Sequence, residues 1–309
     1  MDRETSIGYT CHGVTWATGK PTLLLANASA HRLEHVEIVG RALGFRATKA
    51  ARYCTGRYRF VGTYKVEPLP CPRQAEAAVG DQCASCSAQD EFRLAHRFHH
   101  GGYVPDSLHA YMAQPHFLYL ATFAHAVSKV GTAARPRKSS RLNEQGPIRA
   151  TYLAEVADGR TVRHLEDSLS AHLGVAQTIR AAAKVAALVT PDIEEAEAAH
   201  ENLLARAVAH LADLRQTPIN EAWSPPVASQ KLTTPPGQHQ RVSYPHDLRE
   251  GKHGFYIESC LGTAVLVRLT PEPDPDPTRY VVDLNALRGA HVDLGNFSSP
   301  PTPTQAALF

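Results

Sequence analysis

Four cysteines in the first third of the chain have a spacing that suits a metal site. They follow the pattern C-x16-C-x11-C-x2-C, at Cys54, Cys71, Cys83 and Cys86. The two-residue spacing of the last pair lets both thiolates face one ion. The surrounding segment has little apolar periodicity and many Pro, Gly and Gln residues, so it lacks the means to build its own hydrophobic core. We therefore predict a closed structural zinc site, which stabilises the fold and leaves no position for an activated water.

Two alternatives to a zinc site stay open for these cysteines. In one they are unrelated buried thiols, and in the other the C-x2-C pair is a redox couple. In a variant of the zinc site, His99 or His100 replaces one cysteine as ligand. Cys11 and Cys260 lie far away in the sequence, and we expect them to be ordinary core residues.

A second group of residues suits phosphodiester chemistry. Six cations and one acid fall within the 21 residues 129–149, an excess that favours an anionic partner. The six are Lys129, Arg135, Arg137, Lys138, Arg141 and Arg149. Cleavage of a phosphodiester needs a base near the nucleophile, cations on the developing charge and a metal ion at the leaving oxygen. Tyr119 can be the base only if its pKa is depressed, and the basic run supplies a field of the right sign.

The runs FLYLAT and AVSKVG, the second of which contains Lys129, precede the other five cations and resemble the motif of the GIY-YIG endonucleases. In that family a small antiparallel sheet carries two tripeptides, the next helix carries an arginine that contacts phosphate, and a later helix carries a glutamate that binds one divalent ion. The residues that match are Tyr119, Gly131, Arg141 and Glu166. The resemblance implies that Glu166 binds Mg²⁺ or Mn²⁺. The tyrosine of the second tripeptide is replaced by Lys129, which can contact a phosphate as a point charge.

The same residues also allow simpler roles. Tyr119 is equally well assigned as a packed strand residue, and Glu166 as a charge on a helix surface. The basic run is then the solvated face of a helix. Arg180 and Lys184, four residues apart on one helix face, either extend the basic surface or bind the acids at 194–197.

A longer resemblance covers most of the chain. The runs PHFLYLA, KVGTA and RLNEQGPIRATYLAEV, followed by a Glu-bearing helix, are similar to the bacterial domain-of-unknown-function family 2797. The cysteine cluster before them and a β segment near 262–292 after them extend the similarity. The matching positions are His116, Tyr119, Lys129, Gly131, Arg141, Gln145, Gly146 and Glu166. This resemblance implies a GIY-YIG-like fold and brings no activity with it.

The elements that must position these residues follow from the apolar periodicity. PTLLLAN and HVEIVG predict strands near the N-terminus, and FLYLAT, AVSKVG and IRATYLAEV predict three strands of a central sheet. A polar helix is expected through Glu144, and Gln145-Gly146 is expected to stop it. Apolar positions at helical spacing in 161–190 and the helix formers of 192–214 complete a prediction of three helices. GFYIESCLGTAVLVRL and RYVVDLNALRGAHVDL predict further strands.

The fold class expected from this order is α/β (α+β), with a small mixed sheet and helices in the core. The predicted units are an N-terminal β subdomain (1–53), a zinc-ribbon-like cysteine segment (54–110), a GIY-YIG-like α/β domain with C-terminal helices (111–216), a Pro-rich linker (217–250), a C-terminal β segment (251–295) and a disordered tail (296–309).

The composition indicates the cellular compartment of the protein but does not identify its binding partner. The formal net charge of +2 is close to neutral for 309 residues, so attraction to phosphate must come from local clusters. No segment reaches the roughly 18 apolar residues of a membrane helix, and the N-terminus lacks a secretory pattern. We therefore expect a cytoplasmic protein without membrane association, whose cysteines are reduced or metal-bound.

These observations predict a zinc-stabilised protein that interacts with DNA or RNA. One hypothesis is cleavage with Mg²⁺ or Mn²⁺, and a second is a binding module without chemistry. A third is a small-molecule enzyme on the same scaffold, because a fold does not determine a function. The predicted catalytic residues are Tyr119, Lys129, Arg141 and Glu166, and the predicted nucleic-acid-binding residues are Arg135, Arg137, Lys138 and Arg149.

Overall fold

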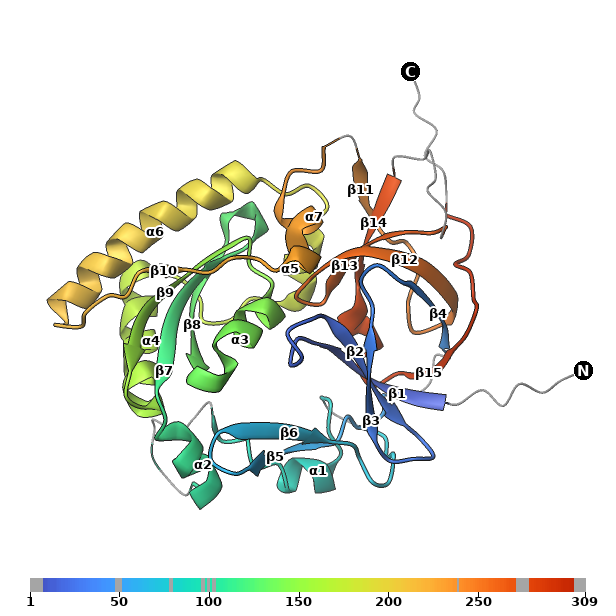
Figure 1. Ribbon diagram of the computed structural model, residues 1–309, viewed down its shortest axis with the longest axis horizontal. Helices are drawn as coiled ribbons and strands as arrows, with labels where there is room; N and C mark the ends of the chain where they lie inside the picture. Colours follow the sequence, from blue (N-terminus) through green and yellow to red (C-terminus); the bar gives the residue numbers. More distant parts are fainter. Residues whose placement is uncertain are drawn as a thin grey trace, which may run out of the picture.

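The fold is a mixed α/β one, as the sequence predicts. The computed structural model describes residues 8–47, 52–77, 80–95, 98, 101, 104–237, 239–270 and 278–302. Figure 1 shows a four-stranded sheet with its helices on the left, a nine-stranded sheet on the right and a two-stranded hairpin below them. Within the described part of the chain, no helix combines the length and the hydropathy needed to cross a membrane.

The four-stranded sheet has the order β10-β9-β7-β8. Its strands are β7 (His116–Thr122), β8 (Ser128–Ala134), β9 (Arg149–Val156) and β10 (Glu221–Ala222). β7 is buried along its whole length, because elements cover both faces of the sheet, and this explains its nearly uninterrupted apolar sequence. Tyr119 of β7 lies opposite Gly131 of β8 and Tyr152 of β9. The three central strands predicted from the sequence are confirmed.

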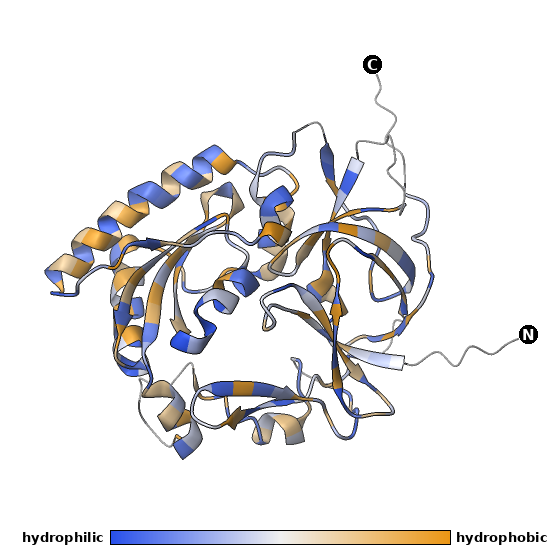
Figure 2. Cartoon of the chain, in the orientation of Figure 1, coloured by the Kyte–Doolittle hydropathy of each residue, from blue (hydrophilic) through white to orange (hydrophobic). Residues whose placement is uncertain are grey.

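Helices cover both faces of this sheet. They are α3 (Lys138–Gln145), α4 (Gly159–Leu173), α5 (Ala181–Ala187) and α6 (Ile193–Asp213). Leucines of α4 and α6 pack on Leu118, Leu120 and Val130. Leu142 of α3 packs on the opposite face, in the cluster that contains Tyr119. Figure 2 shows hydrophilic residues alternating with hydrophobic ones along α6, as expected of a helix with one solvated side.

Two glycines and one aspartate determine where the helices nearest the candidate site begin and end. Asp158 accepts hydrogen bonds from the backbone N–H groups of Arg160 and Thr161 and so caps α4. α4 ends at Gly174 (φ 70°), and α3 ends at Gly146 (φ 64°), both in the left-handed conformation that favours glycine. The predicted helix stop at Gly146 is confirmed.

The nine-stranded sheet combines strands from both ends of the chain. In sheet order they are β11 (Gln240–Ser243), β14 (Thr278–Asp283), β13 (Ala264–Arg268), β12 (Gly251–Leu261), β4 (Ala42–Ala47), β15 (His291–Leu294), β1 (Gly8–Thr15), β2 (Thr22–Asn27) and β3 (Leu33–Glu37). β4 lies between β12 and β15, so the two predicted β units share one sheet and one core. Cys11 and Cys260 are buried in that core, as expected.

The segment predicted as a linker joins both sheets. β10 pairs with β9, β11 pairs in parallel with β14, and α7 (Gln230–Thr233) packs on β12. Trp223 is buried against the central sheet, and its Nε1 donates to Asn143 Oδ1 at 3.1 Å. The described residues of this segment therefore follow an ordered path between the two sheets.

Part of the predicted disordered tail is ordered. Ser299 Oγ donates to the Gly254 carbonyl oxygen at 2.8 Å and accepts the Gly254 N–H at 3.1 Å. A side chain at Gly254 would meet the carbonyl oxygen of Phe297 at 1.9 Å, so glycine is what lets the tail approach β12. This corrects the expectation for 296–302, and 303–309 lie outside the described residues.

The cysteine-rich part is a hairpin with two short helices. It contains β5 (Arg57–Val61), β6 (Lys65–Leu69), α1 (Ala84–Ala88) and α2 (Asp106–Met112). Phe60 and Phe92 pack on Tyr111 of α2, with ring centroids 5.2 and 5.6 Å from the tyrosine ring. The cysteines form a separate cluster from these aromatic residues.

Candidate functional site

The four cysteines predicted as metal ligands come together in space. Their sulfur atoms all lie within 4.8 Å of one another, and all four side chains are buried. Cys54 lies just before β5 and Cys71 just after β6, while Cys83 and Cys86 lie at the start of α1. The hairpin and the helix each present two sulfurs to one point.

The size of the cluster fits a metal ion. Thiolates bound to a tetrahedral zinc ion at about 2.3 Å lie about 3.8 Å from one another, which is compatible with the observed limit. Gly56 helps to shape the site, since its N–H donates to Cys54 Sγ at 3.3 Å. A side chain at Gly56 would meet the Leu69 carbonyl oxygen at 1.8 Å, so only glycine allows this turn.

The thiols differ in how readily they ionise. The backbone N–H of Cys86 lowers the pKa of Cys83 to about 7, whereas burial raises the pKa of Cys54 and of Cys86. A bound cation favours the thiolate form of every ligand. The alternative ligands His99 and His100 lie outside the described residues. The cluster is compatible with a structural metal site.

The basic run does not form an unpaired basic surface. Four of its cations lie in ion pairs: Arg135 with Glu155, Arg137 with Glu144, Lys138 with Glu221 and Arg149 with Glu197. Three of these acids come from β9, β10 and α6, at 20, 83 and 48 residues from their partners. Lys138 also lies over the rings of Phe117 and Tyr152, 4.3 and 4.6 Å from their centroids. The local excess of cations is therefore largely neutralised by acids of the folded chain, and the role predicted for these four residues in binding nucleic acid stays a prediction.

Three further cations of this region line a cavity of about 330 Å³ between α3, α5 and the turn from β12 to β13. Lys129 belongs to β8, Arg141 to α3 and Lys184 to α5. Glycines let the turn approach α3 closely: a side chain at Gly146 would meet the backbone nitrogen of Gly262 at 2.7 Å. The cavity therefore depends on contact between the central domain and the nine-stranded sheet.

We call Lys129, Arg141 and Lys184 the cavity cations. Among the residues that the structure describes, none of the three forms an ion pair with a carboxylate. Glu144 lines the cavity, but its Oε2 accepts from Arg137 Nη2 at 2.5 Å. Lys184 Nζ donates to the carbonyl oxygen and to Oε1 of Gln145, both at 3.1 Å. The cavity carries an excess of positive charge and suits an anion.

Burial and mutual repulsion weaken the charge of the two lysines. Burial is the main cause that lowers the pKa of Lys129 to about 8, with Arg141 acting in the same direction and Glu166 against it. Burial, followed by Lys129 and Arg141, lowers the pKa of Lys184 to about 7. A bound anion would favour the protonated amines and raise both pKa values.

Tyr119 lies beside these groups and is fully buried. Its ring lies across Gly131, where a side chain would come within 2.5 Å of the hydroxyl oxygen. The hydroxyl group finds no hydrogen bond of ordinary geometry among the described residues. Burial raises the pKa of Tyr119, and nearby Arg141 only partly opposes this effect. The pKa of Tyr119 is therefore shifted away from the depressed value that a base would need, because desolvation outweighs the field of the cations.

Glu166 is buried on α4 and is near the same group. Its Oε2 accepts from Arg163 Nη1 at 2.6 Å. It raises the pKa of Lys129 and of Tyr119, and Arg141 acts on the same two groups, so the structure brings the four predicted catalytic residues into one electrostatic cluster. A helix-surface charge does not describe this carboxylate, of which 5% is exposed.

Sequence reasoning left Lys184 undecided and missed the opposite wall of the cavity. Lys184 points to Gln145 and the ring of Phe123 rather than to the acids at 194–197. The turn at 261–264 is far away in the sequence, and nothing in its composition marks a site. Gly146 and Gly262 mark in the sequence where α3 and the turn at 261–264 come close together. No local sequence pattern connects these two glycines.

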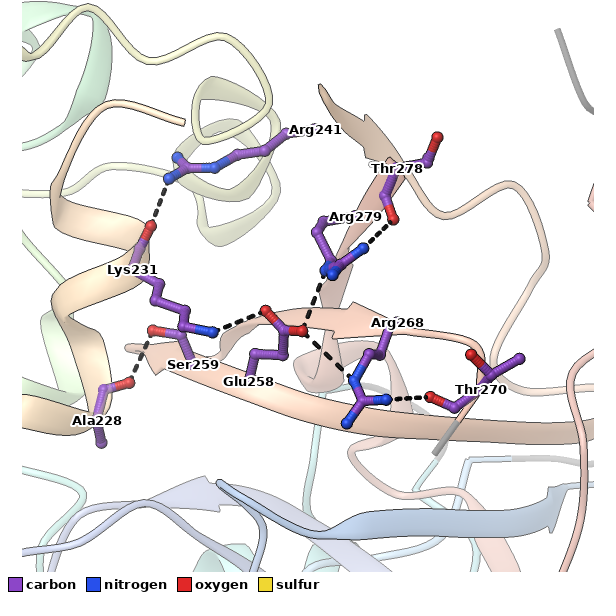
Figure 3. A network of polar contacts seen from close by, with 9 residues as sticks. All are labelled: Ala228, Lys231, Arg241, Glu258, Ser259, Arg268, Thr270, Thr278 and Arg279. Atoms are coloured by element: carbon purple, nitrogen blue, oxygen red, sulfur yellow. Dashed lines mark hydrogen bonds and ion pairs between the residues drawn. The ribbon is translucent and has the colours of Figure 1, made fainter. Parts of the chain in front are cut away.

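A second cluster of cations has a carboxylate at its centre. Figure 3 shows Lys231, Arg268 and Arg279 converging on Glu258 of β12. Lys231 Nζ lies 3.0 Å from Oε2, while the Nε atoms of Arg268 and Arg279 lie 3.5 and 3.1 Å from Oε1. Arg241 extends this network by donating to the carbonyl oxygens of Lys231 and Thr234. The Glu258 cluster connects α7 to β12, β13 and β14.

The family model described as "Protein of unknown function (DUF2797)" matches residues 75–247, more than half of the chain. The chain belongs to this family. The DUF2797 match contains the cavity cations, Cys83 and Cys86, whereas Cys54, Cys71 and the turn at 261–264 lie outside it. Comparisons with curated proteins and with solved structures give no match.

Proposed function

We propose that this DUF2797 protein binds nucleic acid by holding a backbone phosphate in the cavity, and that zinc at the cysteine cluster stabilises its fold. The observation that carries the proposal is the cavity itself, in which three cations converge without a carboxylate partner among the described residues. Phosphate oxygens would replace the missing acid, with Arg141 as a bidentate donor and Lys184 as a point charge.

The arrangement of the elements supports a GIY-YIG-like core. β7 and β8 are antiparallel, with Tyr119 facing Gly131, and the next two helices carry Arg141 and Glu166. This is the order that the resemblance implies. It makes a phosphodiester the kind of phosphate that we expect in the cavity.

The binding experiment compares labelled single- and double-stranded DNA and RNA by fluorescence anisotropy at several salt concentrations. We expect Arg141→Gln to weaken binding about tenfold or more, because it removes a charge-assisted contact to phosphate. Arg46→Gln is the matched control, since Arg46 pairs with Asp293 on the nine-stranded sheet. Equal affinities of the two variants and the parent for every ligand would refute the proposed site.

Metal-dependent cleavage is the second candidate function. The buried carboxylate of Glu166, next to Lys129 and Tyr119, supports it. Glu166 would hold Mg²⁺ or Mn²⁺, and such an ion would stabilise the charge on the leaving oxygen. The raised pKa of Tyr119 and the Arg163–Glu166 ion pair favour binding without cleavage. The parent protein is tested for cleavage with each ion. Cleavage by the parent, lost in Glu166→Gln while the affinity for nucleic acid is retained, would favour the nuclease over the binding protein.

Zinc is the proposed occupant of the cysteine cluster because four thiolates form a soft, closed ligand set. We expect about one zinc ion per chain by elemental analysis, and its loss with the folded state in Cys86→Ser. Cys260→Ser, at a buried cysteine far from the cluster, is the control for the loss of a thiol. Freshly purified protein without metal would contradict the assignment. A reducing compartment such as the cytoplasm suits this site.

A further inference from the structure

Lys129 differs from the other cavity lysine in having no partner for its amine. It is 6% exposed, lies on the edge strand β8 and lines the cavity. Among the described residues its side chain has no hydrogen bond and no ion pair. Lys184, in contrast, donates to two oxygens of Gln145 and lies 4.3 Å from the centroid of the Phe123 ring. The amine of Lys129 is therefore free to meet a ligand.

The charged groups that surround Lys129 favour its neutral amine. Arg141 faces it from α3 and Lys184 from α5, while α4 contributes Arg163 and Glu166, which pair with each other. Together with burial, this excess of cations lowers the pKa of Lys129 to about 8. A desolvated lysine beside other cations is a nucleophile near neutral pH.

We propose that Lys129 forms a Schiff base with the carbonyl carbon of a phosphorylated aldehyde whose phosphate is held by Arg141 and Lys184. This deepens the proposed function, on which it rests, because the ligand occupies the same cavity. The site brings together a buried amine without a partner and two cations that can hold an anion.

The reaction is balanced without an oxidant or a reductant. The neutral amine of Lys129 attacks the carbonyl carbon, a C–N bond forms, and a proton passes from nitrogen to the former carbonyl oxygen. The C–O bond then breaks, and the hydroxyl group leaves as water with one proton taken from solvent. A protonated imine remains on Lys129, and hydrolysis reverses each step.

The chemistry requires an aldehyde and a phosphate within one sugar-sized unit. A cavity of about 330 Å³ is at the small end of the range for ligand sites and suits one such unit. Two sources supply it: the ring-opened sugar of an abasic position in nucleic acid, and a free phosphorylated aldehyde. The proposed function favours the abasic position.

The test traps the imine by reduction in the full-length protein. One arm uses an oligonucleotide with an abasic site and cyanoborohydride, and the other uses pyridoxal phosphate and borohydride. Peptide mapping by mass spectrometry locates the adduct. We expect Lys129 to be labelled. The concentration that gives half-maximal labelling should be about tenfold lower for pyridoxal phosphate than for pyridoxal, because pyridoxal lacks the phosphate.

Matched variants separate the proposed lysine from the others. Lys129→Met should lower the adduct yield by about tenfold or more. The variant should stay folded, because methionine removes a buried charge and has a side chain of similar length. Lys129→Arg keeps the charge and should also lose the adduct. Lys20→Met, at an exposed lysine paired with Glu37, should leave the yield unchanged. Labelling of the parent should rise between roughly pH 7 and 9, as the amine of Lys129 loses its proton.

The outcomes distinguish the reactive lysine from the function on which it rests. Adducts at Lys129 with the abasic oligonucleotide support both. An adduct with pyridoxal phosphate alone, without affinity for nucleic acid, supports the reactive lysine and overturns nucleic-acid binding. Nucleic-acid binding that is lost in Arg141→Gln, without any adduct at Lys129, overturns the Schiff base and leaves the proposed function standing. Equal labelling of the parent and Lys129→Met also overturns it.

Discussion

The cavity cations and the Glu258 cluster each bring three cations together, but only the second has a carboxylate at its centre. Glu258 accepts from elements of two kinds, a helix and two strands, and so holds them in one arrangement. The cavity cations also come from three elements, but around an open volume. The same number of charges therefore stabilises the fold in one region and leaves room for an anion in the other.

The two regions meet the cost of burying like charges in different ways. Around Glu258, burial would raise the pKa of the carboxylate, but Lys231 and Arg279 outweigh that effect and lower it. In the cavity, the amines respond to burial and repulsion with lowered pKa values instead. An anion site is thus indicated by buried cations that have lowered pKa values and no carboxylate partner among the described residues.

The largest expected effect is the loss of the central acid from the Glu258 cluster. Glu258→Gln leaves three cations without their common partner, and we expect the free energy of unfolding to fall by about 3 kcal/mol. Urea denaturation followed by circular dichroism measures it. Glu37→Gln is the control, because Glu37 pairs with Lys20 and Arg41 at an exposed site, where a change below about 1 kcal/mol is expected. Similar changes in the free energy of unfolding of both variants would contradict the structural role assigned to the Glu258 cluster.

The second prediction makes the cavity resemble the Glu258 cluster. Gln145→Glu places a carboxylate where Oε1 now accepts from Lys184 Nζ at 3.1 Å. We expect the affinity for inorganic phosphate to fall about tenfold, since the new acid competes with the anion. The free energy of unfolding should rise by about 1 kcal/mol, because the pair is charge-assisted. Calorimetric titration and urea denaturation give the two values. Unchanged phosphate affinity would show that the anion does not use this part of the cavity.

The third prediction concerns pH and the burial of Lys129. Its pKa of about 8 in the folded protein is lower than the ordinary value of 10.5, so the unfolded chain binds more protons between these two pH values. Stability contributed by this group therefore rises with pH across that window. Lys129→Met removes the dependence and should be more stable than the parent at pH 7 by about 1 kcal/mol. Melting temperatures of both proteins, compared from neutral pH to about pH 10, should converge; a constant difference would contradict the assignment.

The smallest effect is expected at the paired surface cations. Arg135 forms its ion pair with Glu155 at a largely exposed position. Arg135→Gln should change the free energy of unfolding by less than about 1 kcal/mol and nucleic-acid affinity by less than about threefold. Anisotropy titrations alongside Arg141→Gln measure the difference. A loss as large as that of Arg141→Gln would restore the basic surface that the sequence predicts.

The order of strands and helices in the central domain could be predicted because each element carries its own periodic signal. The runs FLYLAT and IRATYLAEV contain β7 and β9, and Gly146 stops α3 as expected. The cysteine cluster was predictable from spacing, since nearby thiols in a polar segment need a shared partner. The single sheet formed by both ends of the chain could not be predicted, because strands that pair over such sequence distances leave no local signal.

The candidate site was only partly predictable for the same reason. Tyr119, Lys129, Arg141 and Glu166 could be selected, and they do share one cluster, yet their protonation could not be inferred. Burial is a property of the folded chain, and it reversed the expected direction for Tyr119. The partners that neutralise the basic run are up to 83 residues away, so no local window contains them.

Residue types and their spacing along the chain were enough to specify four cysteines that can share one ion, apolar periods for strands and helices, and glycines where the chain must turn. Tertiary packing was needed to establish which cations are neutralised and which line a cavity. The physical reason is that spacing acts through bonds along the chain, whereas charge compensation and desolvation act through space. They depend on distances that exist only after the central domain and the nine-stranded sheet have packed together.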